Sequence, residues 1–283
     1  MHVEAYAPGP MTSPFDEETA VRPLGVGRYV ATMAQSWWVM RGPNGGYLAA
    51  VILRALTHAV DDPARTPRSL TVHYLSAAGE GDVEIATVRE RIGRSMTTCS
   101  ARLMQDGRLV AIAIAAFSSP RPGPEFCDTV MPQVPGPNFY REVRRDVTGL
   151  PAIATRWDTR WAIGHPPSPG VPRGSRAVAG GWIRLPELRV VDALVAAAIT
   201  DAWVPPTFSR MEEPFVVPTV DLTIHFRTEL PHPGLAAADF VLASFRTTVA
   251  AGGFLEEDGE VWAPDGTLLA QSRQLATLLP LNR

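Results

Sequence analysis

Apolar and polar positions follow the same order twice along the chain. Residues 46–60 are apolar at most positions, which predicts a buried helix. Alternating segments then predict four strands, at residues 69–76, 83–91, 95–104 and 109–117. In the second half a helix is predicted at 190–204, and strands at 219–227, 240–249, 254–262 and 267–279. Each half therefore predicts one helix followed by a four-stranded antiparallel meander.

The two halves also match residue by residue at both ends of the meander. Val72-His73-Tyr74 corresponds to Ile224-His225-Phe226, a separation of 152 residues. Asp106-Gly107 corresponds to Asp265-Gly266, a separation of 159 residues. Because the two separations are nearly equal, we interpret the chain as an internal duplication.

Proline-rich segments separate the two repeats. Residues 118–137 and 165–172 are rich in proline, which resists regular structure because it lacks the backbone N–H and fixes φ. We expect an N-terminal repeat at residues 14–118, a connector at 119–177 and a C-terminal repeat at 178–280.

Composition excludes several classes of function. All 26 basic residues are arginine, so Schiff-base, pyridoxal-phosphate and Walker A chemistries, which need a lysine, are excluded. The net charge of −3 argues against a nucleic-acid partner. With two isolated cysteines, no secretory signal and no apolar run long enough to span a membrane, the sequence indicates a cytoplasmic protein. Neither metal-ligand spacing nor a GxSxG motif occurs, so we expect no metal and no serine nucleophile.

The repeat resembles a known family. A helix that opens with Asn44-Gly45-Gly46-Tyr47, a strand such as SLTVHYLSAA, the bend Gly93-Arg94-Ser95 and the segment DGRLVAIAIAAF look like the hotdog fold of acyl-CoA thioesterases. The duplication is similar to the double-hotdog, type II enzymes. The resemblance covers residues 14–118 and 178–280, and it implies an α+β fold in which one continuous sheet surrounds two buried helices.

The resemblance also implies a single hydrolytic site, in which an Asp, a Thr and a Gln of the second repeat hold a nucleophilic water. The matching positions are Asp221, Gln274 and Thr247, with Thr248 as the alternative to Thr247. Thioester hydrolysis needs a base for the water, groups that orient it and N–H donors for the oxyanion. Asp221 is the candidate base, and the amides near Gly45 and Gly46 at a helix N-terminus are candidate donors.

The repeats differ at these positions. Ser69 and Ala115 occupy the places of Asp221 and Gln274 in the first repeat, so we expect only one complete site. The substrate-binding candidates are the start of the first predicted helix, an arginine for the coenzyme A phosphates and a threonine: Asn44, Gly45, Tyr47, Arg94 and Thr248.

Simpler interpretations exist for each of these residues. Alternation places Asp221 on a polar strand face, where it is also explained as a solvated residue or as an ion-pair partner of Arg227. The Asn44-Gly45-Gly46 segment is equally typical of an N-cap and a tightly packed helix entry, and Tyr47 of a core aromatic. Gln274 shares its face with apolar residues, so a buried amide there needs partners.

The sequence therefore predicts hydrolysis of acyl-CoA to free acid and coenzyme A by direct water attack, without a cofactor. Two other functions stay open: an acyl-CoA hydratase or dehydratase on the same fold, and a non-catalytic acyl-CoA or lipid-binding module. Exposed outer strands favour a homodimer.

Overall fold

A computed structural model describes residues 13–143, 149–166, 174–212 and 215–280. The α-helices are α1 (Pro14–Glu18), α2 (Gly45–Val60) and α3 (Ala193–Ile199). Short 3₁₀ helices are η1 (Gln35–Trp37), η2 (Pro137–Phe139), η3 (Ala152–Arg156) and η4 (Pro206–Ser209). The strands before the connector are β1 (Arg22–Gly25), β2 (Arg28–Met33), β3 (Thr66–Tyr74), β4 (Gly81–Ile92), β5 (Met96–Gln105) and β6 (Arg108–Ser118).

The remaining strands belong to the connector and the second repeat. They are β7 (Asp158–Gly164), β8 (Ala177–Arg184), β9 (Phe215–Val216), β10 (Thr219–Phe226), β11 (Val241–Thr247), β12 (Ala250–Ala251), β13 (Phe254–Trp262), β14 (Leu268–Thr277) and β15 (Leu279–Pro280). Thirteen of these strands form one sheet in the order β1-β2-β4-β5-β6-β3-β10-β14-β13-β11-β8-β7, with β12 beside β13, and β9 pairs with β15 separately. The predicted double hotdog is confirmed.

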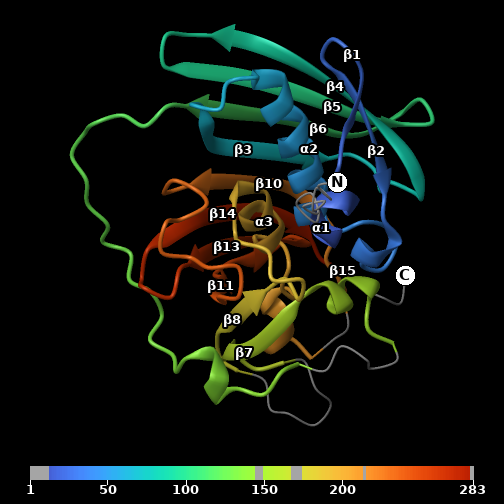
Figure 1. Cartoon of the computed structure of the whole chain (residues 1–283). Coiled ribbons are helices and arrows are strands. Elements are labelled where there is room, and N and C mark those ends of the chain that lie inside the picture. The colour runs from blue at the N-terminus through green and yellow to red at the C-terminus, as the bar shows by residue number, and fades with distance from the viewer. Residues whose placement is uncertain (1–12, 144–148, 167–173, 213–214, 281–283) are drawn as a thin grey trace, which may run out of the picture.

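The two repeats meet at the antiparallel pair β3 and β10. Thr71 lies opposite Thr223, and their hydroxyls are 3.0 Å apart. These residues are 152 positions apart, the separation found between the matching motifs. A pseudo-twofold axis therefore passes between Thr71 and Thr223. The pairing of β3 with β10 joins the two meanders into one sheet (Figure 1).

Helices α2 and α3 are buried against this sheet and pack against each other. Helix α2 lies against β3 to β6 and against α3, which also contacts β14. Helix α2 begins after Asn44, whose side chain accepts the Tyr47 amide at 3.1 Å, and it ends at Asp61 in the left-handed conformation. Helix α3 is shorter than residues 190–204, because Asp192 caps its start and regular structure ends at Thr200.

The connector runs down one side of the molecule from the first repeat to the second (Figure 1). Its apolar residues Met131, Val134 and Tyr140 pack on a cluster that includes Trp182 and Trp262. The Trp182 indole N–H donates to the Pro135 carbonyl at 2.8 Å. Strand β7, within the predicted connector, extends the sheet beside β8. The connector thus covers the outer face of the second meander.

No helix among the described residues has the length and apolarity to cross a membrane.

Candidate active site

The structure separates two of the residues that were expected to act together. Gln274 on β14 is buried and lies opposite Leu222, a core residue of β10. Asp221 precedes Leu222, so its side chain points to the other face of the sheet, where its cross-strand neighbours are Leu275 and the exposed His73. The predicted grouping of Asp221 with Gln274 is therefore wrong, because strand alternation puts them on opposite faces.

A different aspartate occupies the expected place beside Gln274. Asp201 follows the last turn of α3, next to the first turn of α2. Its Oδ2 accepts the Asn44 Nδ2–H at 2.8 Å and the Gly46 amide at 3.1 Å, and its Oδ1 lies 3.5 Å from Gln274 Nε2. Asp201 thus joins the helix start of the first repeat to the strands of the second.

Thr219 at the start of β10 completes the contacts of Gln274. Its hydroxyl donates to Gln274 Oε1 at 2.9 Å. Alternation along β10 would place Thr219 on the same face as Asp221. A β-bulge between these two residues reverses that order, so Thr219 lies opposite the buried Ala276 and faces inward.

Glu257 brings a second carboxyl to the same place. It lies opposite Gln274 on the neighbouring strand β13 and is 6% exposed. Its Oε1 accepts the Gln274 Nε2–H at 2.8 Å. We call the residues Asn44, Gly46, Asp201, Thr219, Glu257 and Gln274 the inner polar cluster.

The start of α2 is built for close approach. A Cβ at Gly46 would lie 2.5 Å from the Ala198 carbonyl oxygen, and one at Gly45 would lie 2.9 Å from Asp201 Oδ2. Glycine is needed because the two helices meet backbone to backbone here. The Gly46 amide donates to Asp201, and the Gly45 carbonyl accepts the Tyr74 hydroxyl at 2.7 Å. The Gly46 amide therefore faces the carboxylate, where an oxyanion donor was expected.

The other predicted substrate-binding residues lie outside this cluster, Asn44 apart. Tyr47 is fully buried, stacks on Trp37 and donates its hydroxyl to the Glu18 carbonyl at 2.6 Å. Arg94 is exposed in the turn between β4 and β5, three strands away from β10 in the sheet. Thr248 is exposed, and both its amide and its hydroxyl donate to Glu256. Among the described residues, Arg94 and Thr248 have no hydrogen bond to the inner polar cluster, and Tyr47 contacts it only through its amide, which donates to Asn44 Oδ1.

Thr247, the favoured threonine at the sequence level, faces inward on β11. It is 7% exposed, and its hydroxyl has no hydrogen-bond partner within the described part of the chain. The threonine that is hydrogen-bonded to Gln274 is Thr219.

Burial sets the charge of the two carboxyls. Loss of solvent raises the pKa of Asp201 from 3.8 to about 6, against the opposing effect of hydrogen bonds from Gly46, Gln274, Gly45 and Asn44. Burial, followed by the nearby charge of Asp201, raises the pKa of Glu257 well above its usual value. At neutral pH Asp201 is therefore mostly ionised, and burial shifts Glu257 toward its protonated form. An aspartate with this pKa can take up a proton near neutral pH.

Two features of the sequence indicate Asp201 and Glu257, although strand alternation alone does not identify them as site residues. Asp201 follows a buried, alanine-rich helix, where the helix dipole disfavours an acid. Glu257 lies between Leu255 and Val261 on the apolar face of its strand. A carboxyl in either place requires partners inside the protein.

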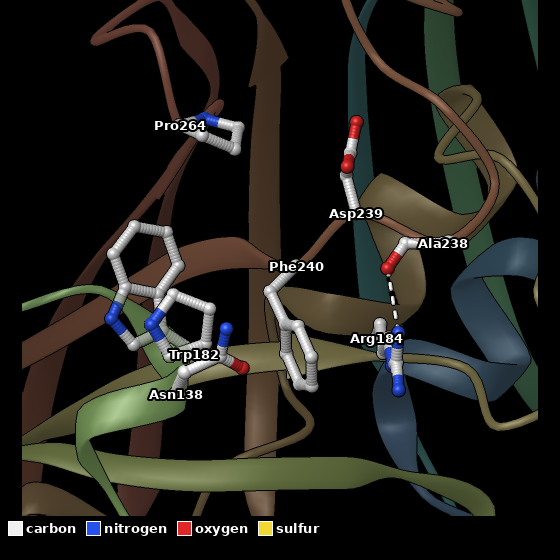
Figure 2. A pocket seen from close by; sticks show the side chains of 8 residues that line it. Asn138, Trp182, Arg184, Ala238, Asp239, Phe240 and Pro264 are labelled. Carbon is white, nitrogen blue, oxygen red and sulfur yellow. Dashed lines mark hydrogen bonds between the residues drawn. The ribbon is translucent and has the colours of Figure 1, made fainter.

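A surface pocket of about 310 Å³ lies elsewhere, on the outer side of the second meander. Figure 2 shows Trp182, Phe240 and Arg184 lining it, with Arg184 donating to the Ala238 carbonyl at 2.6 Å. The pocket contains no member of the inner polar cluster. Among the described residues, no group of three or more His, Cys, Asp or Glu side chains is placed to hold a metal ion.

Comparison with known proteins agrees with this architecture. The family model for the acyl-CoA thioesterase C-terminal domain matches residues 124–278, and the model for the N-terminal domain matches residues 34–118. The chain therefore belongs to the acyl-CoA thioesterase family. No protein in the search of curated proteins matches the chain.

Solved structures give the same result for the fold. A conserved hotdog-fold protein of unknown function from Alicyclobacillus acidocaldarius is 28% identical, with a TM-score of 0.85, over 95% of this chain and 98% of its own. A protein assigned as a thioesterase II from Thermobifida fusca YX is 26% identical, with a TM-score of 0.79 and the same coverage. The acyl-CoA thioesterase II TesB2 from Mycobacterium marinum is 20% identical, covers 95% and 99% of the two chains, and shares the fold with a TM-score of 0.76.

Proposed function

We propose that this protein hydrolyses acyl-CoA thioesters by direct attack of water, and that Asp201 is the base that activates the water. The observation that carries the proposal is the convergence of Asp201, Thr219 and Gln274 in a chain of the acyl-CoA thioesterase family. One residue supplies a carboxylate, and the others supply a hydroxyl and an amide. These are the groups that a hydrolytic water needs for deprotonation and orientation.

Each residue has a distinct part in the proposed reaction. Asp201 accepts a proton from the water, whose oxygen attacks the thioester carbonyl carbon. The Gln274 amide and the Thr219 hydroxyl orient the water beside Asp201. The tetrahedral intermediate collapses with cleavage of the C–S bond, and the proton returns to the thiolate to give coenzyme A. The positive end of α2 lies beside this site, where it favours the negative charge.

Asn44 and Gly46 hold the base in place. Both donate to the same oxygen of Asp201, so its other oxygen faces Gln274. This geometry explains why the first repeat supplies a helix start and the second supplies the acid and the amide. Ala115 occupies the position of Gln274 in the first repeat, so the amide is missing from the pseudo-symmetric place.

A panel of acyl-CoAs of different chain length and shape, assayed by released thiol, tests the function. We expect wild-type protein to release thiol from at least one member, and Gln274→Ala to lower kcat by about tenfold or more because the water loses an orienting group. Absence of thiol release from every member would contradict the proposed activity.

A further inference from the structure

Glu257 is a buried carboxyl that the proposed reaction does not use. It lies on the inner face of β13, and its one hydrogen bond within the described residues is from Gln274 Nε2. A carboxyl at an apolar position of a core strand is unfavourable unless a partner is bound. The partner here is a residue of the proposed catalytic centre.

The Gln274 side chain has two possible orientations, related by exchange of its oxygen and nitrogen. In the observed orientation the oxygen accepts from Thr219 and the nitrogen donates to Glu257, with Asp201 Oδ1 at 3.5 Å. In the exchanged orientation the amide oxygen would face two carboxyl groups. Glu257 Oε1 is the nearer of the two acceptors and selects the observed orientation.

We propose that Glu257 is a positioning residue, whose carboxyl oxygen fixes the Gln274 amide so that its oxygen faces Thr219 and its nitrogen faces Asp201. This inference rests on the proposed thioesterase function. Without the carboxyl oxygen of Glu257, the amide loses its shorter hydrogen bond and rotates, and the water is no longer oriented beside the base.

The groups around Glu257 indicate how its carboxyl acts on the Gln274 amide. The charged groups that act on Glu257 are Asp201, after α3, and its chain neighbours Glu256 and Asp258. Tyr74 on β3 lies near Asp201, and its hydroxyl donates to the Gly45 carbonyl. Glu256 and Asp258 alternate to the other face of β13, where Arg273 lies 3.9 Å and 3.3 Å from them. The β11–β13 register ends at the pair of Arg246 and Asp258, and the uncharged Thr247 and Glu257 are the next residues of the two strands. Glu257 has no salt bridge among the described residues, so it contributes as a hydrogen-bond acceptor for Gln274 and not as a member of an ion pair.

Two substitutions at Glu257 separate positioning from other roles. Glu257→Gln keeps a carbonyl acceptor without an ionisable group, and Glu257→Met keeps the size without an acceptor. We expect kcat to fall by about tenfold or more in the Met variant, with KM within about threefold of wild type, because the interaction acts on the oriented water. The Gln variant is expected to restore kcat to within about threefold, with an unchanged acid limb of the kcat/KM profile.

The experiment uses full-length protein, the acyl-CoA that wild type hydrolyses fastest, and released thiol as the readout, with thermal unfolding as the control for folding. Wild-type kcat in the Met variant would overturn the inference, because Glu257 would then only fill space. A Gln variant as inactive as Asp201→Asn, or with its acid limb displaced downward by about one pH unit or more, would also overturn it, because Glu257 would then act as an ion. The result for the Gln variant tests the inference even if the Met variant does not fold. Wild-type inactivity on every acyl-CoA would instead refute the proposed function.

Discussion

Replacement of Asp201 by asparagine tests how far the fold raises the pKa of this carboxyl. Burial raises its pKa from 3.8 to about 6. A pKa change of one unit corresponds to about 1.4 kcal/mol, so ionisation of Asp201 lowers the free energy of unfolding by about 3 kcal/mol. The asparagine variant has no such ionisation.

The sign of the effect follows from proton linkage. Because the folded-state pKa lies above the unfolded-state pKa, the folded chain binds more protons between about pH 4 and pH 6. The contribution of Asp201 to the free energy of unfolding therefore falls as the pH rises through this window. The difference in unfolding free energy, Asp201→Asn minus wild type, is expected to rise by about 3 kcal/mol between pH 4 and pH 7 and to be flat above.

Urea unfolding followed by tryptophan fluorescence measures this difference at several pH values. Asp221→Asn is the matched control, since it removes the same charge from the outer face of the sheet. Its difference from wild type is expected to change by less than about 1 kcal/mol over the same range. A flat Asp201→Asn difference from pH 4 to pH 7 would refute the reasoning, because Asp201 would then titrate alike in the folded and unfolded chain.

Four further predictions follow from the same contacts. The acid limb of kcat/KM is expected near pH 6, with activity falling about tenfold per pH unit below it, and a limb near pH 4 would contradict Asp201 as the base. Thr219→Val is expected to lower kcat by about tenfold, because the Thr219 hydroxyl is hydrogen-bonded to Gln274. Thr247→Val is expected to keep kcat within about threefold of wild type, because the Thr247 hydroxyl has no hydrogen-bond partner in the described part of the chain. Steady-state thiol release compares the two variants. Gly46→Ala is expected to destabilise by about 1–3 kcal/mol in urea unfolding, since its Cβ would lie 2.5 Å from the Ala198 oxygen; stabilisation would show that the helices separate freely. Trp182→Ala is expected to speed proteolysis within residues 120–135, because the indole holds Pro135, and an unchanged cleavage rate would show that other contacts hold the connector.

Much of the architecture could be predicted because the chain repeats its pattern. Strand β13 begins and ends at the residues that alternation indicated, and α2 differs from the expected helix by one residue. The strands that were not predicted are β1, β2, β7, β8, β9 and β12. Strand β8 includes Gly180 and Gly181, which interrupt alternation and allow close backbone contact with the neighbouring strands.

The site could be predicted only in part, for a local reason. Gln274 was predicted from the resemblance to acyl-CoA thioesterases, and its place on an apolar face indicated that its amide needs partners. Thr219 was missed because a β-bulge reverses alternation before Asp221, and a bulge has no reliable sequence signal here. Asp201 was missed because its partners, Asn44 and Gly46, are more than 150 residues away in sequence, so only the packing of α2 on α3 brings them together.

The most direct test of the central claim compares thiol release by Asp201→Asn and Asp221→Asn under single-turnover conditions, with wild type alongside. The two variants lose the same group from opposite faces of the same structure. We expect Asp201→Asn to lower the rate by about 100-fold or more and Asp221→Asn to stay within about threefold of wild type. The reverse order, with Asp221→Asn inactive and Asp201→Asn near wild type, would contradict the assignment of Asp201 as the base.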